Sequence, residues 1–118
     1  SKMLHKAGFR DSWRELFPDP VTHPGATWPA PAWKRDSTSW APKVDERDRI
    51  DFIYHNGQGV KASRAWIVGS PQYYVYNELA EPKTSDSFAL AKMPWPSDHK
   101  GVLVDFTTLG KSPQTKKN

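Results

Sequence analysis

The tripeptide Ser97-Asp98-His99 sets a carboxylate beside an imidazole, immediately before the apolar run of residues 101–106. Burying two such groups at the start of a strand costs on the order of several kcal/mol unless each has a partner. Asp51, an acid set in an apolar, strand-like run, is the expected partner of His99. A histidine exchanges protons near neutral pH, and a carboxylate can fix its tautomer and stabilise its charged form. The pattern predicts an Asp51–His99 pair for proton transfer, with Asp98 facing the other way, toward a metal ion or an attacking water.

Three strands are expected to carry these side chains. The first covers residues 50–54 and ends at the turn signal Asn56-Gly57. The second covers residues 60–68, and we expect it to pair antiparallel with the first across that turn. The third covers residues 102–106 and is apolar on both faces, which fits the middle of a two-sided sandwich. The Asp51–His99 pair requires the first and third strands to be neighbours.

Two short helices are expected before these strands. The first covers residues 1–7. The second covers residues 11–17, where Ser12 and Glu15 have the spacing of a capping box and Pro18 ends the helix.

Irregular segments fill the rest of the chain. Residues 18–48 contain six of the eleven prolines, so only a short strand near residues 26–28 is expected there. Residues 69–96 are expected to form a long loop or a partly helical excursion that sets specificity.

Composition limits the chain to one small domain with one core. The absence of cysteine excludes disulfides and thiolate metal sites without deciding the compartment. No run approaches the roughly 18 apolar residues of a membrane span. The net charge of +4 falls to about +1 without the three lysines of residues 110–118, which we expect to be a solvated polar tail. The charge therefore gives little support to nucleic-acid binding.

Several motifs resemble one known family. RIDFIY at residues 49–54 and PWPSDHKGVLVDF at residues 94–106 resemble the two C-terminal motifs of the endonuclease/exonuclease/phosphatase superfamily, which includes deoxyribonuclease I and exonuclease III. GFRDSWRELFPD followed by GATW, upstream, is similar to the family's helix and the Thr-Trp stretch after it. The resemblance implies that residues 1–109 are the C-terminal half of a deoxyribonuclease I-like α/β sandwich, of the α+β class with mainly antiparallel strands.

The resemblance also implies the roles of three residues. In the family, the aspartate of the RIDFI-like strand orients the histidine of the SDH motif, which acts as a base or as a phosphate ligand. By position these roles fall on Asp51 and His99, and the role at the metal and water site falls on Asp98. The implied activity is metal-dependent hydrolysis of a phosphodiester or phosphomonoester by activated water. Mg²⁺ or Mn²⁺ is the implied ion, because the family's ligands are hard oxygens.

The sequence departs from the family in what it lacks. The family's asparagine, metal-binding glutamate, second histidine and Asp-x-Asn motif all precede the segment that matches this chain. Half of a sandwich exposes sheet edges and an apolar face. We therefore expect the chain to need its missing N-terminal half, a partner chain or self-association, and to be inactive alone. The substrate stays open among nucleic acid, a lipid headgroup and a sugar phosphate.

Alternative interpretations accompany each of these expectations. The chain could be a catalytically silent fragment that serves as a binding module, or a basic nucleic-acid-binding module, although it has no known signature of the latter. Asp51 could be a structural acid paired with Arg49 or Arg64, and His99 could be an ordinary loop histidine. Five tryptophans are expected to be anchors of the core or of loops: Trp28, Trp33, Trp40, Trp66 and Trp95. Three cations are expected to be solvated: Lys34, Arg35 and Lys100.

Overall fold

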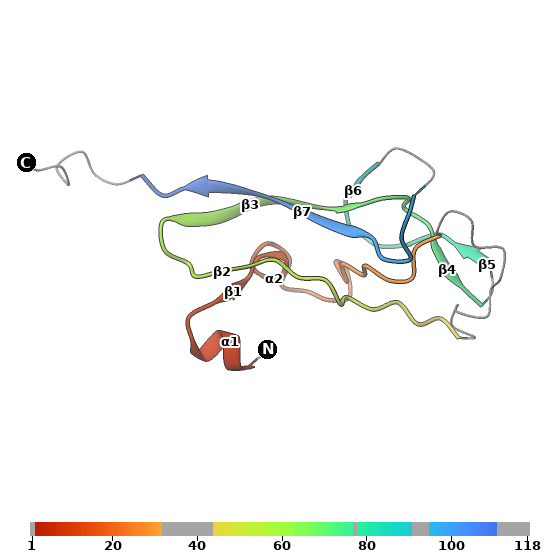
Figure 1. The fold of residues 1–118 in the computed structure, drawn as a ribbon, viewed down its shortest axis with the longest axis horizontal. Coiled ribbons are helices and arrows are strands. Elements are labelled where there is room, and N and C mark those ends of the chain that lie inside the picture. The colour runs from red at the N-terminus through yellow and green to blue at the C-terminus, as the bar shows by residue number, and fades with distance from the viewer. Residues whose placement is uncertain (1, 32–43, 77, 91–94, 111–118) are drawn as a thin grey trace, which may run out of the picture.

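The computed structural model describes residues 2–31, 44–76, 78–90 and 95–110 (Figure 1). In agreement with the sequence, it is dominated by sheets, with few helices and mainly antiparallel strands. Residues 32–43 and 111–118, which include Trp33, Lys34, Arg35, Trp40 and most of the expected tail, lie outside the described residues. The elements in chain order are α1 (Lys2–Lys6), β1 (Arg10–Asp11), α2 (Ser12–Leu16), β2 (Tyr54–His55), β3 (Val60–Val68), β4 (Tyr73–Val75), β5 (Glu78–Ala80), β6 (Phe88–Ala89) and β7 (Gly101–Thr108).

A three-stranded sheet in the order β6-β3-β7 forms the larger layer. β3 has the bounds that the alternation of its side chains predicted, and it pairs antiparallel with β7 from Val60–Thr108 to Val68–Gly101. The expectation that the last strand lies in the middle of a sandwich is wrong for the described residues. The nine-residue β3 takes the central place, and β7 forms the edge.

The expected hairpin between the first two strands is also wrong. β2 pairs antiparallel with β1, whereas β3 pairs with β7 and β6. Gly57 and Gly59 both have positive φ, of 78° and 77°, and the chain changes layers between them. The turn therefore connects two sheets instead of closing one hairpin (Figure 1).

The first expected strand, residues 50–54, is mostly irregular, and only Tyr54 belongs to β2. The backbone N–H groups of Ile50 and Asp51 donate to the hydroxyl Oγ1 of Thr27, each at 3.2 Å, instead of to a neighbouring strand. A side chain thus replaces the ladder hydrogen bonds that the apolar pattern predicted.

The capping residue of α2 is Asp11, not the expected Ser12. The Asp11 backbone is extended, with φ −77° and ψ 111°, and its Oδ1 accepts from the N–H groups of Trp13 at 3.1 Å and Arg14 at 3.4 Å. Ser12 instead lies inside the helix and donates its backbone N–H to the carbonyl of Ile53.

Two small clusters form the core. Trp13 of α2 packs on Ala65 and Ile67 of β3, and all three side chains are buried. Tyr73 and Val75 of β4 pack on Ala26 in the second cluster. Large aromatic side chains bury much apolar area each, which explains how a chain of low hydrophobic content holds a core.

The described part of residues 69–96, the expected long loop or partly helical excursion, contains three short strands and no helix. β4 and β5 make an antiparallel hairpin, and β6 then runs parallel to the end of β3. In the part of the chain that the structure describes, no helix is long and apolar enough to cross a membrane.

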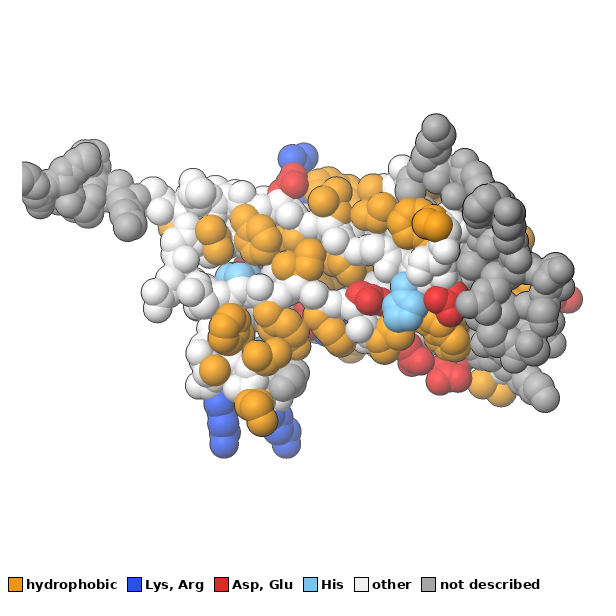
Figure 2. All heavy atoms as spheres, viewed as in Figure 1, with side chains coloured by type: hydrophobic (Ala, Val, Ile, Leu, Met, Phe, Trp, Pro, Cys, Tyr) orange, Lys and Arg blue, Asp and Glu red, His pale blue; other side chains and the backbone are white. Residues whose placement is uncertain are grey.

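Hydrophobic side chains lie along β3 and β7 on one face of the molecule (Figure 2). Leu103 of β7 is 46% exposed, and Phe106, which points to the opposite face of the strand and contacts the His55 ring, is 37% exposed. Within the described ranges β7 pairs on one side alone, with β3. β7 therefore presents an open strand edge with exposed apolar side chains, which is typical of a surface that another polypeptide covers.

Candidate functional site

The central contact of the site joins Asp51 and His99. Oδ2 of Asp51 lies 2.7 Å from Nδ1 of His99, and both side chains are 41% exposed. The predicted hydrogen bond is therefore confirmed. An ionised carboxylate has only acceptors, so Nδ1 carries the proton and Nε2 holds the lone pair of the neutral ring. Among the described residues no group hydrogen-bonds to Nε2, which is left available to a molecule outside this chain.

Neither residue of the pair lies within a strand, contrary to the prediction of two neighbouring strands. Thr27, which is fully buried, connects the two segments that carry them. Its hydroxyl accepts from the N–H of Asp51, and its carbonyl accepts from the N–H of Lys100 at 2.6 Å. One residue of the Thr-Trp stretch thus holds the aspartate segment and the histidine segment together.

The loop before β7 is held by further hydrogen bonds at both of its ends. Nε1 of Trp95 donates to the carbonyl of His99 at 2.7 Å, which confirms the expectation that Trp95 is an anchor. The N–H of His99 donates to the hydroxyl of Ser97 at 3.0 Å, and the N–H of Ala30 donates to the carbonyl of Asp98 at 2.6 Å. These contacts fix the backbone on both sides of the imidazole.

Asp98 is half-buried, and its backbone is fixed beside His99. The described residues contain no group of three or more His, Asp or Glu side chains that could hold a metal ion. Hard cations such as Mg²⁺ need several oxygen ligands in near-octahedral geometry. The side chains described here therefore do not fit a complete Mg²⁺ or Mn²⁺ site, and Asp98 could supply at most one ligand of such a site.

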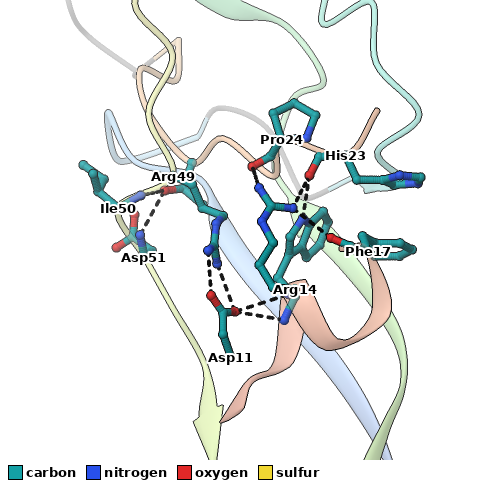
Figure 3. A network of polar contacts seen from close by, with 10 residues as sticks. Asp11, Arg14, Phe17, His23, Pro24, Arg49, Ile50 and Asp51 are labelled. Atoms are coloured by element: carbon teal, nitrogen blue, oxygen red, sulfur yellow. Dashed lines mark hydrogen bonds and ion pairs between the residues drawn. The ribbon is translucent and has the colours of Figure 1, made fainter. Parts of the chain in front are cut away.

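Asp51 could instead have been a structural acid paired with Arg49 or Arg64, but both arginines have other partners. Arg49 forms a two-point ion pair with Asp11, at 3.0 and 2.6 Å, and Arg64 pairs with Asp105 at 2.9 Å. Figure 3 shows Arg49 pointing toward Asp11 while Asp51 points to the other side of the segment. Asp51 is thus left to His99.

Sequence reasoning missed a second carboxylate–histidine pair, formed by Glu15 and His55. Oε1 of Glu15 lies 3.1 Å from Nε2 of His55, and Oε2 accepts from the N–H of Ala62 at 2.9 Å. The N–H of Gly57 donates to Nδ1 of the same ring at 3.0 Å. Both ring nitrogens are engaged, and the ring is buried, so this histidine holds the structure together. The capping-box interpretation of Glu15 hid this role.

Lys100 differs most from its expected state, because it is buried at 2% exposure instead of solvated. Its Nζ donates to the backbone carbonyls of Ser70 and Gln72. Burial lowers the pKa of Lys100 to about 7. No local pattern indicates this environment, because the carbonyls belong to a turn about thirty residues away.

Four cavities among the described residues, one of about 630 Å³ and three of 250–290 Å³, lie elsewhere. The largest of the four is lined by Leu4, His5, Asp11, Arg14, Arg49, Phe52 and Tyr54, and none of the four includes Asp51, Asp98 or His99. Among the described residues, no hydrogen-bond partner lies on Nε2 of His99, and the imidazole–carboxylate contact, not a cavity, marks this place as the candidate site.

Comparisons with known proteins give one informative match. The chain is 30% identical over 108 residues to an uncharacterized protein of Caenorhabditis elegans, and the match covers 91% of this chain and 30% of that protein. The chain thus spans about 30% of the length of this relative. No family model matches the chain, and no solved structure matches it.

Proposed function

We propose that Asp51 and His99 are the proton-transfer pair of a metal-dependent phosphoesterase, and that this chain is the C-terminal part of its catalytic domain. The 2.7 Å contact between Oδ2 of Asp51 and Nδ1 of His99 carries the proposal. The order of the motifs along the chain, which resembles the endonuclease/exonuclease/phosphatase superfamily, supports it.

The pair has the chemistry that hydrolysis by water requires. Nε2 of His99 accepts a proton from water as its oxygen attacks phosphorus, or, once protonated, donates a hydrogen bond to a phosphoryl oxygen. Asp51 keeps the proton on Nδ1 and stabilises the imidazolium that forms. A positioned acid–base group of this kind contributes roughly 10²- to 10⁴-fold to a rate.

The remainder of the active site lies outside these residues in this proposal. Asp98 would contribute one ligand to Mg²⁺ or Mn²⁺, and the other ligands would come from an N-terminal half or from a partner chain. The edge of β7, which has no second neighbour among the described strands, and the exposed side chain of Leu103 support docking of such a half. The greater length of the nematode relative is in keeping with a longer parent polypeptide.

A hydrolysis assay tests the proposal directly. The 118-residue chain should not hydrolyse bis(p-nitrophenyl) phosphate with Mg²⁺ or Mn²⁺, since Asp98 alone holds a metal poorly. A longer polypeptide, extended upstream of Ser1 by its coding sequence, should hydrolyse it in a metal-dependent way. The upstream sequence should also encode a glutamate-bearing strand and an Asp-x-Asn motif. Absence of both features, together with an inactive long polypeptide, would overturn the proposal.

The second candidate function is a binding module without chemistry. The lack of a metal-ligand cluster in the described parts of the chain favours it for the isolated polypeptide. Binding of a phosphate ester by the longer polypeptide without turnover would select this function. The substrate class, whether nucleic acid, lipid headgroup or sugar phosphate, would follow from the same assay with each ester in turn.

A further inference from the structure

Lys100 directly follows His99 in the chain, and its side chain is buried. Its Nζ is 4.1 Å from the centre of the Tyr73 ring and 5.7 Å from the centre of the Phe88 ring. An ammonium group has three N–H donors, and here two backbone carbonyls and an aromatic face surround them. Among the described residues no carboxylate pairs with this amine, so its partners are fixed parts of the fold.

The side chain and the backbone of Lys100 hold the same segment from two directions. The backbone N–H donates to the carbonyl of Thr27, while the side chain packs on Tyr73. The hydroxyl of Tyr73 donates to the carbonyl of Ala26 at 2.6 Å. The hydroxyl of Thr27 also accepts from the backbone of Asp51. These hydrogen bonds therefore connect Lys100 with both the Asp51 segment and the His99 loop.

We infer that Lys100 is a positioning residue, which ties the turn at residues 70–72 to the loop that carries His99 and thereby holds the imidazole against Asp51. The turn begins the segment of residues 69–96, so a change in that segment reaches His99 through this amine. The consequence for catalysis rests on the proposed function, whereas the coupling itself is a property of the chain.

Few charged groups of the described residues lie around this amine. His99 precedes it on the same loop, and Arg47 lies 5.5 Å from the Tyr73 ring centre. Burial, and to a smaller extent the charge of Asp86, raises the pKa of the Tyr73 phenol. Glu81 accepts a hydrogen bond from the side chain of Gln72. The carbonyls of Ser70 and Gln72 are therefore the main polar partners of the amine among the described residues.

Nuclear magnetic resonance of the 118-residue chain tests the inference without any enzyme assay. The substitution Lys100→Met keeps the length and removes the donors. The Nδ1 proton of His99, shifted downfield by Asp51, should disappear or move, while the ring signals of His55 should not change. Lys61→Met, on an exposed position of β3, is the matched control and should alter neither histidine. A folded Lys100→Met protein with unchanged His99 signals would overturn the inference.

A second variant covers the case in which Lys100→Met does not fold. Tyr73→Phe keeps the ring on which Lys100 packs and removes only the hydroxyl that donates to the carbonyl of Ala26, so the Nδ1 proton signal of His99 should move. An unchanged His99 signal in a folded Tyr73→Phe protein would overturn the inference.

In the longer polypeptide, turnover that falls in Lys100→Met with little change in KM supports positioning. Normal turnover in Lys100→Met beside an inactive His99→Ala overturns the positioning role alone. Normal turnover in both variants overturns the proposed function instead.

Discussion

Removing one partner of the buried ion pair between Asp11 and Arg49 should be strongly destabilising, and Arg49→Met tests this. The side chains of Asp11 and Arg49 are 7% and 18% exposed, and Asp11 also accepts two backbone N–H groups as the cap of α2 (Figure 3). Breaking a buried pair costs about 3–5 kcal/mol, because the remaining charge loses its partner. Since the cap hydrogen bonds remain, we expect a loss of about 3 kcal/mol in the free energy of unfolding, at the lower end of that range.

A second arginine supplies the matched control. Arg64 forms the same kind of pair with Asp105, but these side chains are 71% and 41% exposed. Exposed pairs contribute about 0–1 kcal/mol, so Arg64→Met should reduce stability by less than about 1 kcal/mol. Urea unfolding at neutral pH, followed by tryptophan fluorescence, measures both variants. Equal losses in the two variants would refute the reasoning.

The pH dependence of the same pair gives a further check. Burial alone would raise the pKa of Asp11, but the guanidinium of Arg49 and the cap N–H groups outweigh it and leave the pKa below its usual value of 3.8. A lowered carboxyl pKa gives stability that is present above pH 3.8 and is lost as the pH falls through the native pKa. The difference between the wild type and Arg49→Met should therefore shrink in acid.

Three further predictions concern stability, and urea unfolding tests all of them. Gly25→Ala should lower the free energy of unfolding by at least about 3 kcal/mol, because a Cβ there meets Nε1 of Trp13 at 2.4 Å in a backbone with φ +64°. Gly59→Ala, with open space around it, should lower it by only about 1 kcal/mol. Equal losses would show that the contact with Trp13 is irrelevant. Thr27→Val should lower the free energy of unfolding by about 1–3 kcal/mol, because two backbone N–H groups lose their acceptor. Thr27→Ser keeps the hydroxyl and should lower it by less. A Val variant as stable as the Ser variant would contradict this reasoning. The pKa of Lys100 is about 7 in the folded protein, against an ordinary value of 10.5, so the unfolded chain binds more protons between these pH values. The stability of the wild type should therefore rise from pH 7 to 10.5 relative to that of Lys100→Met. Parallel curves of stability against pH would contradict the lowered pKa.

The parts of the fold that local patterns determine were predictable from the sequence. β3 has its predicted bounds because its side chains alternate over nine residues, and the Asp51–His99 contact follows from motifs whose order is characteristic. α2 was placed within one residue at each end, although its cap was assigned to Ser12 instead of Asp11. Both residue types are common caps, and the choice depends on Arg49, which lies far along the chain.

The parts that depend on distant side chains were not predictable. Residues 50–53 have a strand-like composition, yet the hydroxyl of Thr27 takes two of their backbone donors. The edge position of β7 depends on the pairing of β6 with the other side of β3, and the burial of Lys100 depends on two carbonyls of a distant turn. Periodicity contains no information about such contacts, because they join residues that are far apart in the sequence.

Turnover of a phosphodiester by the longer polypeptide with His99→Ala tests the central claim most directly. His5→Ala is the matched control, because His5 is an exposed histidine of α1 with no carboxylate partner among the described residues. If the imidazole of His99 acts in the transition state, kcat should fall by roughly 10²- to 10⁴-fold with little change in KM, while His5→Ala stays normal. Near-normal turnover in His99→Ala would contradict the claim and would assign the Asp51–His99 pair to the scaffold.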